Sequence, residues 1–96
     1  MAVAAPQKFA SIMTVYATVI VHDREPLERV TGPGGDEWRS QFYNLHTDEE
    51  VIEHFVFNAV TNGVHDITRL EGWADCDSGA ITIEIDDTDQ SVELLP

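Results

Sequence analysis

The 96-residue chain carries 18 Asp and Glu residues against 5 Lys and Arg residues, so its formal net charge is −13. This length fits one small domain with a single core. Direct binding to nucleic acid or to an anionic membrane is disfavoured, because both require clustered basic side chains. The hydrophobic content of 43% argues against a wholly disordered chain.

The two ends of the chain are less clearly patterned than its middle. We interpret residues 1–12 as a leader, residues 13–90 as a single domain and residues 91–96 as an acidic tail, which either docks or frays. The first clear strand is expected over Thr14–His22, where apolar residues occupy both alternating faces. Apolar residues on both faces are typical of a central strand.

The next segment contains turn signals between short apolar stretches. Pro26 lies in a polar turn, after which Leu27–Thr31 is expected to return as a short strand. The sequence Gly-Pro-Gly-Gly at 32–35 indicates a loop. Trp38–Leu45 is expected to form another strand, with aromatic residues at alternate positions.

The strongest local signal predicts a helix over about residues 48–62. Thr47 and Glu50 fit a capping box, in which the threonine hydroxyl accepts a backbone amide of the first turn. Gly63 follows the helix as a left-handed stop. An apolar stripe with helical spacing runs through Ile52, Phe55, Val56 and Ala59.

The last third of the chain predicts a hairpin. Asp66–Leu70 is ambiguous, because Asp66 could cap a short turn or the segment could start a strand. Gly72–Cys76 and Ala80–Asp86 are expected to pair about a turn at residues 77–79. The last strand would point Ile81, Ile83 and Ile85 inward and Thr82, Glu84 and Asp86 outward.

This order of elements predicts a small two-layer α+β domain. We expect an antiparallel sheet of about four to five strands, with the one main helix, about 48–62, packed on one face.

Cysteine content and apolar runs indicate a cytoplasmic protein. Cys76 is the single cysteine, so no intrachain disulfide can form, which suits a reducing compartment. No apolar run is long enough to span a bilayer. The run Ile12–Val21 meets charged residues at once and lacks a signal-peptide cleavage site.

No motif points to catalysis, a metal or another cofactor. Glu50 and His54 are best interpreted as a solvated pair one helical turn apart. Asp75–Gly79 begins like a calcium loop, but its glycine falls at the fifth position, so a turn is favoured. The carboxylates beside Cys76 disfavour a reactive thiolate. We therefore predict a protein that is not an enzyme; a metal-dependent sensor stays open only if the histidines converge.

The negative charge is unevenly distributed. Residues 1–40 have a net charge of −1, and residues 41–96 have a net charge of −12. Three interpretations compete: solubility, a salt-adapted proteome and an acidic surface that faces a basic partner. The asymmetry favours the partner-facing surface over salt adaptation, which would acidify both halves of the chain.

We predict a small acidic protein-binding module, an inhibitor or regulator that docks on a basic, nucleic-acid-binding partner protein. In size, acidity and lack of catalytic motifs the chain resembles the small acidic inhibitors encoded by phages, including DNA mimics and anti-CRISPR proteins. This resemblance rests on composition and implies no site residue. The candidate acidic surface consists of Glu49, Glu53, Asp75, Asp77, Glu84, Asp86, Asp87 and Asp89.

The alternative function is an acidic accessory or structural domain that self-associates, for example as a homodimer, without any target in the nucleic-acid machinery. Its candidate apolar interface residues are Phe57, which lies off the main helix stripe, and Trp73. Large aromatic side chains are enriched where proteins bind one another.

Overall fold

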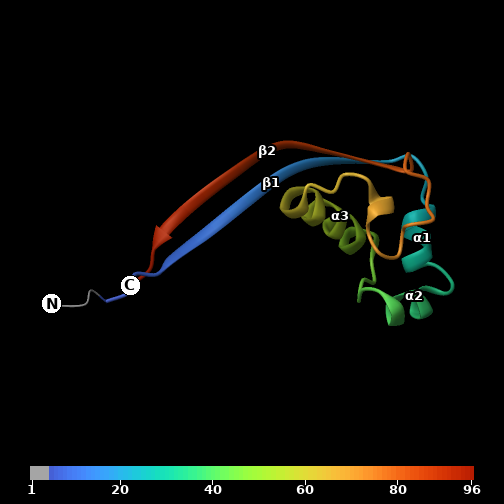
Figure 1. The fold of residues 1–96 in the computed structure, drawn as a ribbon, viewed down its shortest axis with the longest axis horizontal. Helices are drawn as coiled ribbons and strands as arrows, with labels where there is room; N and C mark the ends of the chain where they lie inside the picture. The colour runs from blue at the N-terminus through green and yellow to red at the C-terminus, as the bar shows by residue number, and fades with distance from the viewer. Residues whose placement is uncertain (1–4) are drawn as a thin grey trace.

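The structure, a computed structural model that describes residues 5–96, is a small α+β domain with three α-helices and a two-stranded antiparallel sheet. The helices gather beneath one end of the paired strands (Figure 1). Its elements, in chain order, are β1 (Phe9–Val21), α1 (Glu25–Thr31), α2 (Gly35–Gln41), α3 (Asp48–Asn62), the 3₁₀ turn η1 (Ile67–Arg69) and β2 (Ile81–Leu94).

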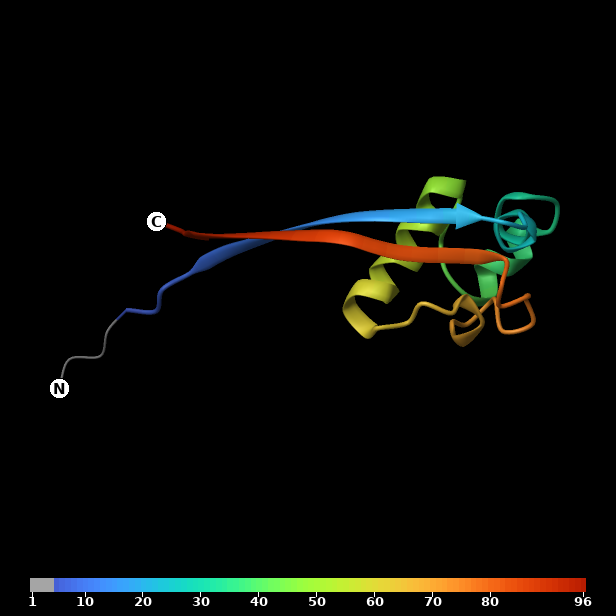
Figure 2. The same ribbon diagram turned by 90° about the horizontal axis from the view of Figure 1, so that it is seen from above.

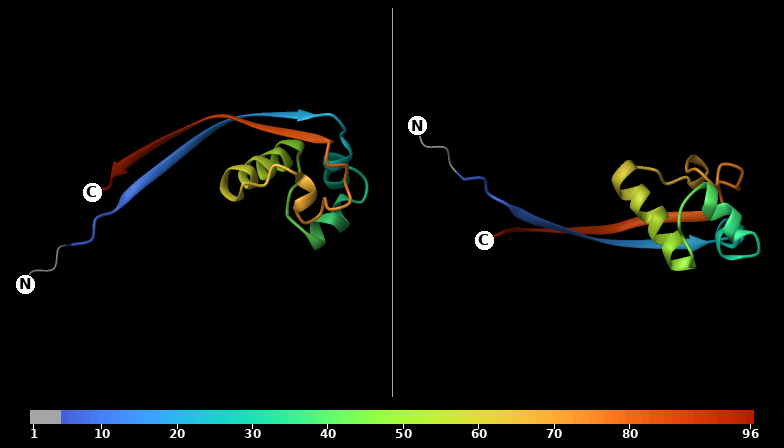
Figure 3. Two further views of the ribbon diagram at one scale, coloured as in Figure 1. Left: turned by 45° about the horizontal axis from the view of Figure 1, so that its top comes forward. Right: turned by 90° about the horizontal axis from the view of Figure 1, so that it is seen from below.

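The molecule is markedly elongated. Its principal extents are 62 × 30 × 20 Å and its radius of gyration is 17.9 Å, against about 13 Å for a compact chain of 100 residues. The elongation comes from the β1–β2 ribbon, one half of which projects away from the helices (Figures 2 and 3). We call residues 9–16 and 87–94 the arm, and the helices with the remaining ribbon the body.

The expected sheet of four to five strands is wrong, because residues 5–96 contain only two strands. The segment expected as a strand at Leu27–Thr31 belongs to α1, which tolerates Pro26 in its first turn and buries Leu27 and Val30. The strand expected at Trp38–Leu45 is absent: α2 covers it up to Gln41, and the rest is irregular. Trp38 and Phe42 are four residues apart, a spacing that shares one face in both a strand and a helix.

The expected hairpin about residues 77–79 is also absent. Gly72–Cys76 forms successive turns, in which the amide of Trp73 donates to the Leu70 carbonyl at 3.2 Å and that of Cys76 donates to the Trp73 carbonyl at 3.0 Å. Strand β2 pairs with β1 instead, from Ile81 opposite Val21 to Leu94 opposite Phe9. Both strands therefore extend into segments that were expected to be leader and tail.

The helix prediction is confirmed. Helix α3 spans Asp48–Asn62, and the Thr47 hydroxyl accepts the Glu50 amide at 3.1 Å. Gly63 ends the helix with φ of 67°. The ambiguous Asp66–Leu70 segment takes the short-turn alternative, since the Asp66 carboxylate accepts the Thr68 amide at 3.0 Å and caps η1.

The core is built around Trp73, which is completely buried. Its indole nitrogen donates to the Pro26 carbonyl at 3.0 Å, which satisfies the one polar group of the ring. The rings of Trp38 and Phe55 lie 4.9 and 4.8 Å from it. The ribbon joins this core through the buried Ile83 and its neighbours on the same face, so the body anchors the inner half of the ribbon.

Gly72 provides a sharp test of this packing. It has φ of 98°, and a Cβ atom placed there would lie 2.6 Å from the Trp38 ring, whereas Gly63 has φ of 67° with open space around it. Gly63→Ala should cost about 1–2 kcal/mol of unfolding free energy from backbone strain alone. Gly72→Ala should cost about 1–3 kcal/mol more, because the core must also shift. Urea unfolding measures both; equal losses would contradict the packing of Trp38 on Gly72.

Candidate functional site

A β-bulge in β2 determines which of its side chains lie on each face of the ribbon. Ala17 pairs with Ile85 and Tyr16 pairs with Asp87, so Asp86 is an extra residue in β2. Side chains alternate along a strand, and one extra residue reverses that alternation for everything that follows. Beyond the bulge, Asp87 and Asp89 therefore lie on the outer face, which is the face turned away from the helices.

The outer face carries a file of carboxylates along β2. Asp86 accepts a hydrogen bond from the Thr18 hydroxyl at 2.7 Å, which fixes its direction toward this face. Neither strand contains a Lys or Arg residue. The file, about 30 Å long at about 3.3 Å per residue, consists of Glu84, Asp86, Asp87, Asp89 and Glu93.

Glu93 is a member that sequence reasoning missed. It lies within residues 91–96, which were expected to be a tail, but β2 continues through it opposite Ala10. The alternation of Ser91, Val92, Glu93 and Leu94 was a signal that could have extended the strand.

The expected acidic surface is only partly brought together. Glu49 and Glu53 lie on α3, in the layer beneath the ribbon, where they border a shallow depression together with Asp48 and Ile52. They do not continue the file on the outer face, so the helix and strand carboxylates form two separate acidic patches.

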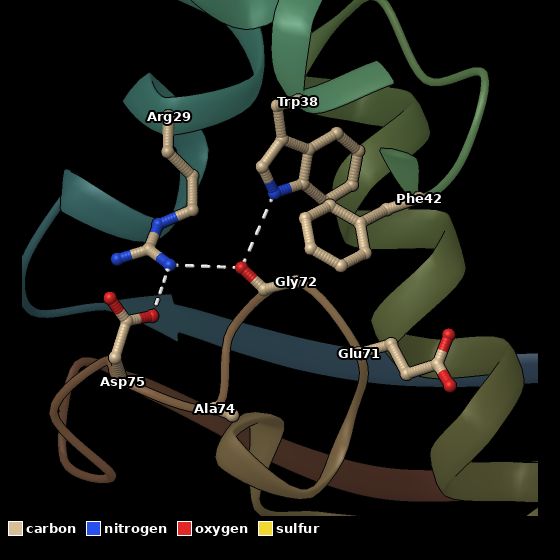
Figure 4. A pocket seen from close by; sticks show the side chains of 7 residues that line it. All are labelled: Arg29, Trp38, Phe42, Glu71, Gly72, Ala74 and Asp75. Atoms are coloured by element: carbon tan, nitrogen blue, oxygen red, sulfur yellow. Dashed lines mark hydrogen bonds and ion pairs between the residues drawn. The ribbon is translucent and has the colours of Figure 1, made fainter. Parts of the chain in front are cut away.

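Asp75 has a structural partner. The Arg29 guanidinium donates to the Asp75 carboxylate at 2.6 Å and to the Gly72 carbonyl at 2.9 Å (Figure 4). Hydrogen bonding to Arg29 lowers the pKa of Asp75 below its ordinary value. Asp75 thus ties α1 to the turns around Trp73, and its charge is already paired.

Asp77 also acts within the fold, since its carboxylate accepts the Gly79 amide at 2.8 Å. This contact is a local turn stabilised by an aspartate side chain. Asp75 and Asp77 therefore do not extend the carboxylate file of β2, contrary to the arrangement expected from a hairpin.

A hollow beside α2 brings side chains from distant segments together. It is lined by Arg29, Trp38, Phe42, Glu71, Gly72, Ala74 and Asp75 (Figure 4). The polar groups inside it already bond to one another: Arg29 contacts Asp75, and the Trp38 indole donates to the Gly72 carbonyl at 3.2 Å. The Glu71 carboxylate points away from Arg29. The hollow is therefore lined by the aromatic rings of Trp38 and Phe42 and by charged groups that are already paired with each other.

The single cysteine is poorly suited to nucleophilic chemistry. Burial, together with a contact of 3.4 Å to the Glu25 carboxylate, raises the pKa of the Cys76 thiol to about 12. A thiol with such a pKa is almost entirely protonated at neutral pH, and the thiolate is the reactive form.

The histidines do not converge with acidic or thiol ligands. Within residues 5–96 no group of three His, Cys, Asp or Glu side chains is placed to hold a metal ion. His54 packs its ring 4.4 Å from that of Tyr43 and 5.6 Å from that of Trp73, and burial lowers its pKa. Across the same residues, none of the helices combines the length and apolarity that crossing a bilayer requires.

The two aromatic residues expected at an interface differ in exposure. Phe57 is 62% exposed, but Trp73 is completely buried, so assigning Trp73 to an interface is corrected. Exposed apolar side chains gather on the arm instead. They are Phe9, Ile12, Met13, Tyr16, Val92 and Leu94, each more than half exposed.

Comparison with known proteins adds no relative to these observations. No family model matches the chain, and searches of curated proteins and of solved structures find no match.

Neutralising Asp75 should destabilise the fold, and neutralising Asp89 should not. Asp75→Asn should lower the unfolding free energy at pH 7, because the lowered pKa of Asp75 stabilises the fold above the ordinary aspartate range. That difference from wild type should shrink as pH falls below about 4 and Asp75 becomes protonated in both states. The control Asp89→Asn removes an exposed carboxylate that forms no ion pair within residues 5–96, and it should cost nothing. Urea unfolding at pH 7 and pH 3 checks this; equal losses at pH 7 would contradict it.

Proposed function

We propose that the chain is a non-enzymatic protein-binding module whose acidic outer ribbon face docks on a basic surface of a nucleic-acid-binding protein. The observation that carries the proposal is the carboxylate file along β2, which has no Lys or Arg on either strand to neutralise it. Docked in this way, the module would act as an inhibitor or regulator, because it would occupy a surface that otherwise holds nucleic acid.

The spacing of the file supports binding to a phosphate-binding surface without copying DNA closely. Five carboxylates over about 30 Å give one charge per roughly 6–7 Å, against one per about 3.4 Å along a DNA strand. Such a file could contact some of the basic side chains in the groove with which a protein binds nucleic acid. Long-range attraction between complementary charges would speed association and make it sensitive to salt.

The way charge is used across the molecule supports this assignment of the outer face. Asp75 and Asp77 are engaged in local structure, and Asp48 pairs with Arg24 at 2.8 Å. The β2 carboxylates lack any such ion pair within residues 5–96. Unpaired like charges along one strand oppose folding slightly, so a benefit in binding explains them better than stability does.

The alternative, a self-associating accessory domain, is supported by a different observation, the exposed apolar residues of the arm. Four of these residues, Phe9, Met13, Val92 and Leu94, lie on the face opposite the carboxylate file. The two functions are therefore compatible.

The proposal is tested with two variants of equal net charge. The ribbon variant combines Glu84→Gln, Asp87→Asn and Asp89→Asn, and leaves Asp86 to bond with Thr18. The control combines Glu28→Gln, Glu37→Gln and Glu71→Gln, three exposed positions of the body.

Each protein is immobilised and exposed to extract of the source cell, and the retained proteins are identified by mass spectrometry. Wild type and control should retain the same basic nucleic-acid-binding protein and release it in 0.5 M salt, and the ribbon variant should lose it. Added wild-type protein should then displace duplex DNA from the purified partner. Equal retention by the ribbon variant, or retention unaffected by salt, would refute docking through the outer face.

A further inference from the structure

Strand β1 differs from β2 in carrying no charge at all. Its thirteen residues, FASIMTVYATVIV, contain no Asp, Glu, Lys or Arg, whereas β2 carries the carboxylate file. Within residues 5–96 each strand pairs on one side only. The second edge of β1 is therefore a long row of backbone groups bordered by uncharged side chains.

Folded proteins usually protect such an edge. Charged side chains, proline or a covering element keep edge strands from pairing with other chains. None of the thirteen residues of β1 is a lysine or a proline, and its arm half is exposed to solvent on both faces (Figures 1 and 3). A two-stranded ribbon without a packed face is marginally stable in water, so the arm gains stability if another strand joins it.

We propose that the arm of β1 pairs antiparallel with the β1 arm of a second copy of this chain. The two-fold axis lies near Met13, so that Phe9 of each copy lies opposite Ala17 of the other, just beyond the arm. This arrangement places the tip of each arm beside the point where the partner's strand enters its body. The product is a four-stranded sheet in the order β2–β1–β1–β2.

The charge distribution restricts the contact between two copies to this edge. Two chains of net charge −13 repel each other, and the uncharged β1 edge is where that repulsion is weakest. In the proposed sheet the two β2 strands are three strand spacings apart, about 14 Å, which exceeds the Debye length of about 8 Å at physiological salt. Pairing through β2 would instead bring two carboxylate files within about 5 Å of each other.

Charge also selects the antiparallel direction. A parallel pair would set the two acidic bodies side by side at one end of the sheet, whereas the antiparallel pair sets them at opposite ends. A two-fold axis perpendicular to the sheet keeps equivalent faces together. The face that holds Met13 and Val92 thus becomes continuous across the four strands, and the carboxylate files lie on the opposite face, on the two edge strands.

A cysteine at the proposed axis tests the pairing directly. Directly opposite residues of antiparallel strands have Cα atoms about 4.5–5.5 Å apart, within the range that a disulfide spans. Met13→Cys is introduced with Cys76→Ser, which removes the single native cysteine. The control is Val92→Cys in the same background, since Met13 and Val92 are 51% and 64% exposed but Val92 belongs to the outer strand.

Under mild oxidation at micromolar concentration, Met13→Cys should give a disulfide-linked dimer and Val92→Cys should remain monomeric. Efficient linkage of Val92→Cys, equal linkage of both or linkage of neither would overturn the proposal. A purified wild-type protein that stays monomeric up to about 100 µM would overturn it too, and would leave the strand of a different protein as the occupant.

A matched pair of charge variants tests the same interface without oxidation. Met13 and Gln90 lie directly opposite each other in the ribbon and share a face. Met13→Glu sets two like charges together at the axis and should raise the dimer dissociation constant at least about tenfold, since charges 5 Å apart repel by about 1–3 kcal/mol. Gln90→Glu adds the same charge in the outer strand and should change it by less than about threefold.

Sedimentation velocity measures both variants at 50 and 500 mM salt. Added salt should strengthen this dimer by screening its net repulsion, whereas it should weaken docking on a basic partner. The opposite salt dependences allow the dimer and the docking on a basic partner to be refuted separately. Equal dissociation constants for Met13→Glu and Gln90→Glu, or a dimer weakened by salt, would contradict pairing through β1.

Discussion

The extra residue at Asp86 determines the chemistry of each ribbon face. In an uninterrupted strand, Asp87 and Asp89 would follow Ile85 on the core side of the ribbon. The bulge turns them outward into line with Glu84 and brings Val92 and Leu94 to the apolar face. One inserted residue thus places all the carboxylates of the arm on the outer face, beside Ile12 and Tyr16, and leaves the opposite face of the arm without a charged side chain. The proposed docking through the outer face depends on that arrangement.

The body makes the arm possible by anchoring the ribbon firmly at one end. The ring of Trp73 fills the centre of the core, and its indole nitrogen donates a hydrogen bond to the Pro26 carbonyl. Ile81 and Ile83 pack the ribbon against this core. The arm adds little to that core, because residues 86–94 are all exposed. Stability and binding are consequently assigned to different parts of the chain: the body folds around Trp73, and the arm presents surface.

The chain's acidity is likewise of two kinds. Some carboxylates are used within the fold, such as Asp75 with Arg29 and Asp66 at the start of η1. Others, chiefly those of β2, form no ion pair among the described residues. A net charge of −13 could reflect solubility alone, but its arrangement in a file on one face is a spatial property that the structure adds to the composition.

The parts of the fold with strong local signals could be predicted from the sequence. Helix α3 has a capping box at its start and a glycine at its end, and both are where the pattern indicates. Helices α1 and α2 have seven residues each, so they offer too few turns for a helical period to be distinguished from strand alternation. Their helical state is decided by packing on Trp73, which local sequence does not encode.

The candidate site was less predictable, because it depends on long-range pairing. Outward orientation of Glu84 followed from the isoleucine alternation, but that of Asp89 required knowing that Tyr16 pairs with Asp87. The break in alternation after Ile85 was visible as a possible bulge. The arm could not be derived in the same way, since Phe9–Ile12 and Ser91–Leu94 are weakly patterned alone and become strands through each other.

The central claim, that the bulge at Asp86 sets the two faces, is tested most directly by cross-strand nuclear Overhauser effects. These should connect Ala17 with Ile85 and Tyr16 with Asp87, and then continue from Thr14 to Asp89. An uninterrupted register that connects Tyr16 with Asp86 and Val15 with Asp87 would contradict the account, because it would place the carboxylates on the apolar face.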